Sequence, residues 1–120
     1  MAYNRPHKNL DAWIQSMDMV RNIYEITTCF PESERFGLIP QMRRASISIP
    51  SNIAEGAARK GKKEFDYFLN IAQGSISELD TQVELATMLN YIDKDAANAL
   101  STKLDSISKM VFGLSRSLKQ

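Results

Sequence analysis

Apolar side chains recur at spacings of three and four residues through four successive stretches of this chain, and this periodicity constrains the fold more than any other feature. Such spacing lines one face of an α-helix, whereas a half-buried strand needs strict alternation, which never lasts beyond a few residues here. The predicted helices cover about residues 10–29, 40–61, 62–90 and 94–118. Helices of this kind with short links predict an all-α protein, an antiparallel up-down-up-down four-helix bundle. Asp93 is a good N-cap for the fourth helix.

The second predicted helix has a proline near its centre. Pro50 has no N–H to donate and its ring crowds the preceding turn, a defect of about 3 kcal/mol in a helix interior. Gly56 adds a penalty of about 1 kcal/mol relative to alanine. Because the apolar spacing continues from Met42 to Ala57, we expect the helix to continue past Pro50 with a bend there, stabilised by packing.

The size of the chain predicts a single domain covering residues 1–120, with residues 1–9 as an extended N-terminal segment. A lone cysteine, Cys29, cannot form an internal disulfide, which favours a reducing compartment and a cytoplasmic location. The N-terminus has no apolar signal-peptide core, and no apolar run approaches the roughly 20 residues of a membrane span. We therefore expect no membrane association.

Residue types that carry catalysis or metal binding are scarce. The chain has one histidine, His7, and it precedes the first predicted helix, so the Glu-x-x-His pairs of a di-iron bundle are excluded. No cysteine or histidine pairs have zinc-site spacing, and the glycines are too scattered for a phosphate loop. His7 and Cys29 lie at opposite ends of the first helix. We therefore predict a protein that is not an enzyme, with no cofactor and no metal.

A cluster of basic residues at the turn between the second and third helices is the clearest candidate for binding. The chain has a net charge of only +1, but residues 43–63 hold six of its fifteen basic residues and one acid. The cluster is a candidate nucleic-acid site, because lysine and arginine contact phosphate. A solvated bundle end is the other interpretation. The candidate residues are Arg59, Lys60, Lys62 and Lys63.

Two further expectations concern the surroundings of this cluster. Phe65 and Tyr67 follow it, but their places in the helical period predict that both are buried, so aromatic platforms for bases are not expected. Arg43 and Arg44 begin the second helix at the other end of the bundle. We expect at least one of these two arginines to pack, or to pair with an acid, instead of binding phosphate.

The third helix carries a second, partly apolar line besides its core stripe. A single bundle needs one apolar stripe per helix, so the second line predicts a further packing partner. A glycine in this line would let another backbone approach closely. The candidate subunit-contact residues are Tyr67, Ile71, Gly74 and Leu85.

A polar stripe marks one face of the second helix. It has two interpretations, a solvent-facing surface or a hydrogen-bonded network within an interface. Glu55 lies four residues before Arg59, a spacing that favours a helical salt bridge. The stripe consists of Arg44, Ser48, Asn52 and Glu55, continued by Arg59.

Three segments together resemble a known family, the four-helix-bundle proteins encoded in intervening sequences of bacterial 23S ribosomal RNA genes. They are QMRRASISIPSNIAEG over 41–56, FLNIAQGSISELDTQ over 68–82 and LNYI over 89–92, and the resemblance covers roughly residues 10–92. It implies a four-helix bundle that assembles with itself as a ring-shaped homopentamer. The accessory proteins of diversity-generating retroelements share this architecture and bind nucleic acid and a reverse transcriptase. No settled biochemical function comes with the resemblance.

The expected function is that of a non-enzymatic, ring-forming bundle protein that binds RNA or a protein partner. Local clustering of basic residues favours binding. The alternative is an assembly scaffold with no nucleic-acid role, which the near-zero net charge favours.

Overall fold

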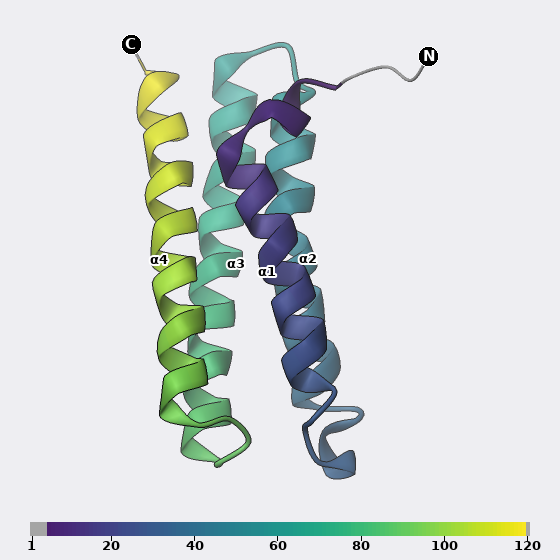
Figure 1. The fold of residues 1–120 in the computed structure, drawn as a ribbon. Helices are drawn as coiled ribbons and strands as arrows, with labels where there is room; N and C mark the ends of the chain where they lie inside the picture. Colours follow the sequence, from purple (N-terminus) through teal and green to yellow (C-terminus); the bar gives the residue numbers. More distant parts are fainter. Residues whose placement is uncertain (1–4, 120) are drawn as a thin grey trace.

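The computed structural model describes residues 5–119 and contains helices and turns, with no strand in that range. The prediction of an all-α helical bundle is therefore confirmed. The elements are η1 Pro6–Asn9, α1 Asp11–Thr27, η2 Glu32–Glu34, α2 Leu38–Ala57, α3 Lys62–Met88 and α4 Lys94–Ser117, where η is a 3₁₀ turn. Figure 1 shows the connections α1–α2 and α3–α4 at one end of the molecule, and the connection α2–α3 with the start of α1 and the end of α4 at the other.

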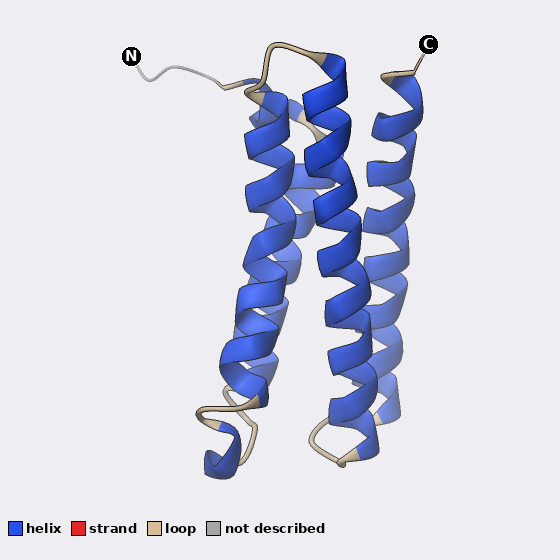
Figure 2. Cartoon of the chain, turned by 180° about the vertical axis from the view of Figure 1, so that it is seen from behind, coloured by secondary structure: helices blue, strands red, loops and turns tan. Residues whose placement is uncertain are grey.

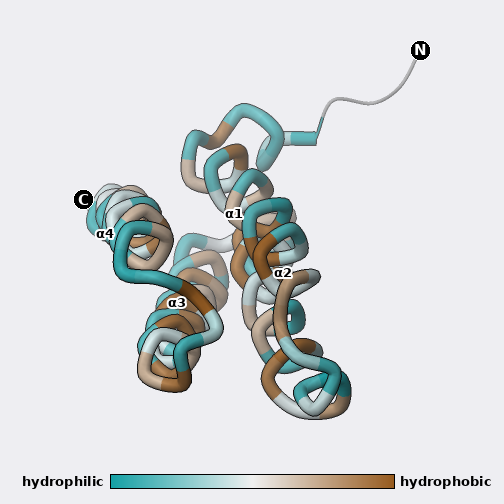
Figure 3. The backbone as a smooth tube through the Cα atoms, turned by 60° about the horizontal axis from the view of Figure 1, so that its bottom comes forward, coloured by the Kyte–Doolittle hydropathy of each residue, from teal (hydrophilic) through white to brown (hydrophobic). Residues whose placement is uncertain are grey.

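Each α-helix packs against two others. α1 contacts α2 and α4, and α3 contacts α2 and α4, with the most extensive contact between α2 and α3. Figure 2 shows the same helices from behind, with short connections between them. Figure 3 looks obliquely along the bundle and shows hydrophobic positions recurring along each helix. This arrangement lets four amphipathic stripes share one core.

On α2, α3 and α4 most core residues are those that the three-and-four spacing selected, whereas α1 buries Ala12, Met19 and Ile23 and leaves Ile14 and Met17, which the spacing had favoured, exposed. All four helices contribute fully buried side chains, for example Met19, Ile53, Leu79 and Leu104. Burial of one such side chain stabilises the fold by about 1.5–3 kcal/mol relative to its exposure. Asp93 caps α4 as predicted, since its carboxylate accepts a hydrogen bond of 2.8 Å from the Ala96 N–H.

α2 is one continuous helix that passes through Pro50, as its apolar spacing predicted. Pro50 is buried, which places its ring among core neighbours. Gly56 is also buried, and its backbone lies against α3. A Cβ built on Gly56 would lie 2.9 Å from the Phe68 Cβ and 3.1 Å from the Phe65 carbonyl oxygen. The two residues with the poorest helix propensity in α2 are thus held by tertiary packing.

The N-terminal segment differs from the expected extended form. Pro6–Asn9 form a 3₁₀ turn, in which the Lys8 N–H donates to the Arg5 carbonyl at 3.1 Å. Proline favours the first turn of a helix because its fixed φ suits it. The His7 ring then packs edge-on against Trp13, with their centroids 5.0 Å apart. Residues 1–4 of the predicted segment lie outside the described residues.

Candidate nucleic-acid interface

The predicted basic cluster lies at the turn from α2 to α3, where all four of its members are exposed. Arg59 is engaged within the subunit. Its guanidinium donates to the Glu55 carboxylate at 3.1 Å and lies 3.8 Å from that of Glu64. It also covers the Phe68 ring at 5.0 Å. The predicted Glu55–Arg59 pair is thus confirmed, and it leaves Arg59 less available for phosphate.

The lysines of the cluster are placed differently. Across residues 5–119, the amino groups of Lys60, Lys62 and Lys63 have no hydrogen bond or ion pair. Gly61 is the N-cap of α3 and supplies no side-chain cap. The N-terminal end of this 27-residue helix adds a partial positive charge beside the lysines. The turn is therefore a concentrated positive site exposed to solvent.

The fold adds further basic residues to this site that sequence reasoning did not select. The last turns of α4 end at the same end of the molecule as the α2–α3 turn (Figure 1). Lys119 approaches Asp66 of α3 with a separation of 4.0 Å, and the Ser115 hydroxyl donates to the same Asp66 carboxylate. We call the combined surface the basic end. It comprises Lys60, Lys62 and Lys63 with Arg116 and Lys119.

The sequence does contain a signal for the positive charge that Arg116 and Lys119 add. No acidic residue follows Asp105, while three bases do. The C-terminal part of α4 is therefore positively charged by itself. Its proximity to Lys62 and Lys63 depends on the packing of α4 on α3, which local patterns do not specify.

The expectation that Tyr67 is buried is wrong. Its side chain is 61% exposed, and its ring meets that of Phe68 edge-on, with centroids 5.2 Å apart. Phe65 is half-buried and packs against the core. Lys63 and Tyr67 are four residues apart, so they lie on the same outward side of α3. Helical periodicity alone did not show whether this side of the helix is buried.

The predicted subunit-contact line on α3 is exposed. Ile71 and Leu85 are 36% and 39% exposed, and no atom lies within 4 Å of a Cβ built on Gly74. Met88 and Leu89 extend the exposed apolar surface beyond the predicted residues. The role of Tyr67, Ile71, Gly74 and Leu85 in assembly stays a prediction.

The predicted polar stripe on α2 divides into two parts. The Ser75 hydroxyl of α3 donates to the Ser48 hydroxyl at 2.7 Å, and the Asn52 amide donates to the Ser48 carbonyl at 2.8 Å. The Ser75–Ser48 bond connects α3 to α2 inside the subunit, whereas the Asn52–Ser48 bond lies within α2. Glu55 instead pairs with Arg59 on the surface. Arg44 lines a separate hollow with Glu78, without an ion pair between them among the described contacts.

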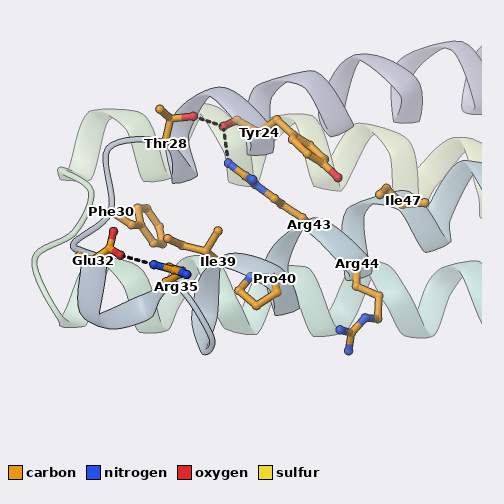
Figure 4. A pocket seen from close by; sticks show the side chains of 10 residues that line it. All are labelled: Tyr24, Thr28, Phe30, Glu32, Arg35, Ile39, Pro40, Arg43, Arg44 and Ile47. Carbon is orange, nitrogen blue, oxygen red and sulfur yellow. Dashed lines mark hydrogen bonds and ion pairs between the residues drawn. The ribbon is translucent and has the colours of Figure 1, made fainter.

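The expectation that one of the first arginines of α2 packs is confirmed for Arg43. Its guanidinium donates to the Thr27 hydroxyl at 2.9 Å and to the Tyr24 carbonyl at 3.3 Å, and it lies 4.5 Å from the Tyr24 ring. Arg43 therefore packs against the C-terminal turn of α1 and donates to one of its carbonyls. Figure 4 shows Arg43 pointing toward Tyr24 and Arg44 pointing in a different direction, beside a cleft of about 620 Å³.

Catalytic and metal-binding groups are not brought together in the part of the chain that the structure describes. Residues 5–119 contain no group of three or more histidine, cysteine or acidic side chains that could hold a metal ion. Cys29 is exposed beyond the C-terminal end of α1, whereas His7 packs at the other end of that helix. No described helix is long and apolar enough to cross a membrane.

Comparisons with known proteins found a family that matches the sequence and a solved structure with a similar fold. A family model described as 23S rRNA-intervening sequence protein matches residues 8–113. One similar solved structure is that of a protein of unknown function from the S23 ribosomal protein family of Bacteroides thetaiotaomicron. It is 22% identical, with a TM-score of 0.78, and the alignment covers 87% of this chain and 97% of that chain. This likeness concerns the fold alone. Comparison with curated proteins gives no significant match.

Proposed function

This chain belongs to the family of 23S rRNA-intervening sequence proteins, and on that premise we propose that it is a non-enzymatic, cytoplasmic protein that forms a homopentameric ring and binds RNA through its basic end. Each subunit is an antiparallel up-down-up-down bundle whose α2 bends at Pro50. The family brings no established activity, so the surface of the subunit has to supply the function.

The exposed apolar line on α3 supports self-assembly. Ile71 and Leu85 lose contact with water if a second copy covers them, which is favourable by about 25 cal/mol per Å² of apolar surface. Gly74 lies between them with open space around it, so a neighbouring helix can approach the α3 backbone there. The resemblance to ring-forming proteins makes that neighbour another copy of the chain.

The single observation that carries RNA binding is the set of three unpaired, exposed lysines at the α2–α3 turn. A salt bridge within the subunit would compete with phosphate, and Lys60, Lys62 and Lys63 have none among the described residues. A ring repeats this cluster in every subunit. Repetition raises the avidity for a polyanion without any new contact, despite a net charge of +1 per chain.

A fluorescence polarisation assay with labelled structured RNA at low and moderate salt tests this function. The variant Lys60→Glu/Lys62→Glu/Lys63→Glu should lose RNA binding, while light scattering shows an unchanged oligomer. Lys94→Glu, at the other end of the bundle, is the matched control and should bind as the wild type does. The scaffold alternative is favoured instead if the wild-type protein has no RNA affinity even at low salt.

A further inference from the structure

Polar side chains join α3 to α4. Three pairs of side chains join the two helices at intervals of seven residues, and the central pair exchanges two hydrogen bonds. The pairs are Asp66 with Ser115, Gln73 with Ser108, and Asp80 with Ser101. A polar seam of this kind remains compatible with water, so this face does not need a protein partner to cover it.

One large aromatic ring stands out on α4. The Phe112 side chain is 58% exposed. No other large hydrophobic side chain of α4 is exposed within residues 94–117. The Arg116 guanidinium lies 6.0 Å from the centroid of its ring. Lys119 follows after three more residues, in the turn just past the end of α4, where its N–H donates to the Arg116 carbonyl at 3.1 Å. Phe112 and Arg116, four residues apart, share one side of the helix, and Lys119 continues the line, over roughly 10 Å in all. The result is an exposed ring followed by two cations.

The lysines of α3 lie next to this line. Asp66, which contacts Ser115 of α4 and Lys119 just beyond it, comes three residues after Lys63 and four after Lys62. Residues at these helical spacings are neighbours on the helix surface. The contacts of Asp66 therefore bring the first turn of α3 beside the last turns of α4. The basic strip is defined as Phe112 and Arg116 of α4, Lys119 just beyond its end, and Lys62 and Lys63 of α3.

We propose that the basic strip binds single-stranded nucleic acid, with the phosphates on its lysine and arginine side chains and one unpaired base stacked on Phe112. This inference rests on the proposed function and specifies which form of polyanion the basic end prefers. Lysines contact the phosphates of any nucleic acid, but a side-chain ring needs a base whose face is available. Bases within a duplex already stack on each other, so an exposed ring adds affinity for a single strand.

Phe112→Ala is the direct test, because an exposed side chain can be removed without opening a cavity. Binding is measured for an unstructured RNA of about ten nucleotides, a DNA of the same sequence and an RNA duplex of the same length. We expect about a tenfold loss of affinity for the single strands, the effect of losing one stacked base. Affinity for the duplex should stay unchanged. Comparison of the affinities for RNA and DNA shows whether the sugar contributes to binding.

The chain offers a matched control. Phe36 is 85% exposed, and the Arg35 guanidinium lies 4.9 Å from its ring, but both are at the opposite end of the bundle. Phe36→Ala should therefore leave all three affinities unchanged, and Phe112→Trp should retain single-strand binding. A Phe112→Ala variant that binds single strands as tightly as the wild type overturns the inference and leaves RNA binding by the lysines intact. A wild-type protein that binds none of the three probes overturns both.

Discussion

Gln73 of α3 and Ser108 of α4 exchange two hydrogen bonds, each of 2.9 Å, from the Gln73 amide to the Ser108 carbonyl and from the Ser108 hydroxyl to the Gln73 side-chain oxygen. The pair lies midway between the Asp66–Ser115 and Asp80–Ser101 contacts. The contacts between α3 and α4 therefore recur every seven residues on both helices.

The energetic role of this pair can be measured with Ser108→Ala. The change removes one half-buried hydrogen bond and leaves the Gln73 oxygen without its donor, so we expect a loss of about 1 kcal/mol in the free energy of unfolding. Urea denaturation gives the value. Ser106→Ala, at an exposed position of the same helix, controls for the higher helix propensity of alanine. Equal stability of the two variants would contradict a role for the pair.

Gly56→Ala should destabilise the protein although alanine favours helix by about 1 kcal/mol. The new methyl group would lie 2.9 Å from the Phe68 Cβ, and this part of α3 can move only by separating from α2. Gly113→Ala is the control, because no atom lies within 4 Å of its built Cβ. Thermal unfolding should show a lower midpoint for Gly56→Ala and an equal or higher one for Gly113→Ala. The reverse order would exclude close packing as the reason for Gly56.

The end of the bundle opposite the basic end should respond to acid. The Leu38 N–H, at 2.9 Å, and the Tyr91 hydroxyl, at 2.8 Å, both donate to Glu34 and lower the pKa of its carboxyl from 4.5. Because the folded-state pKa is lower, these bonds stabilise the fold above about pH 4.5, and this stabilisation is lost as pH falls through the folded-state pKa. The hydrogen bond to Glu34 also raises the pKa of Tyr91.

Tyr91→Phe removes one of the two donors. Near neutral pH its free energy of unfolding should be lower than that of the wild type. The two curves of unfolding free energy against pH should converge as the pH falls below 4.5. The Asp18 carboxyl, whose pKa is lowered by the hydrogen bond from Lys103, titrates in both proteins and cancels from the difference. A difference that stays constant from neutral pH to acid would show that the Tyr91 hydroxyl does not interact with the ionised carboxylate.

If the chain assembles through α3, a single charge introduced into the contact line should strongly weaken the assembly. Ile71→Asp places a carboxylate within the predicted contact line and should dissociate the ring, because a buried unpaired charge costs several kcal/mol. Light scattering should then report about one chain mass of 13.6 kDa in place of five. Phe36→Asp, at the distant exposed ring, should retain the wild-type mass. A monomeric wild-type protein at micromolar concentration would disprove the ring.

The sequence predicted those features that depend on local periodicity. The four helices, the cap at Asp93, the passage of α2 through Pro50 and the Glu55–Arg59 pair all follow from spacing within one segment. It did not predict that Arg116 and Lys119 join the α2–α3 turn, because that proximity arises only when α4 packs on α3. It also predicted that Tyr67 is buried, although its side chain is 61% exposed, because helical spacing does not show how far a second, partly apolar line is covered within the subunit.

The salt dependence of RNA affinity tests the central claim, phosphate binding by the basic end, most directly. Each phosphate contact releases counterions, so the logarithm of the association constant should fall with the logarithm of salt concentration by about 0.7 per contact for a single strand. We predict a steep negative slope for the wild-type protein and no measurable binding by Lys60→Glu/Lys62→Glu/Lys63→Glu over the same salt concentrations. RNA affinity that is independent of salt, or a triple variant with the wild-type slope, would contradict the account.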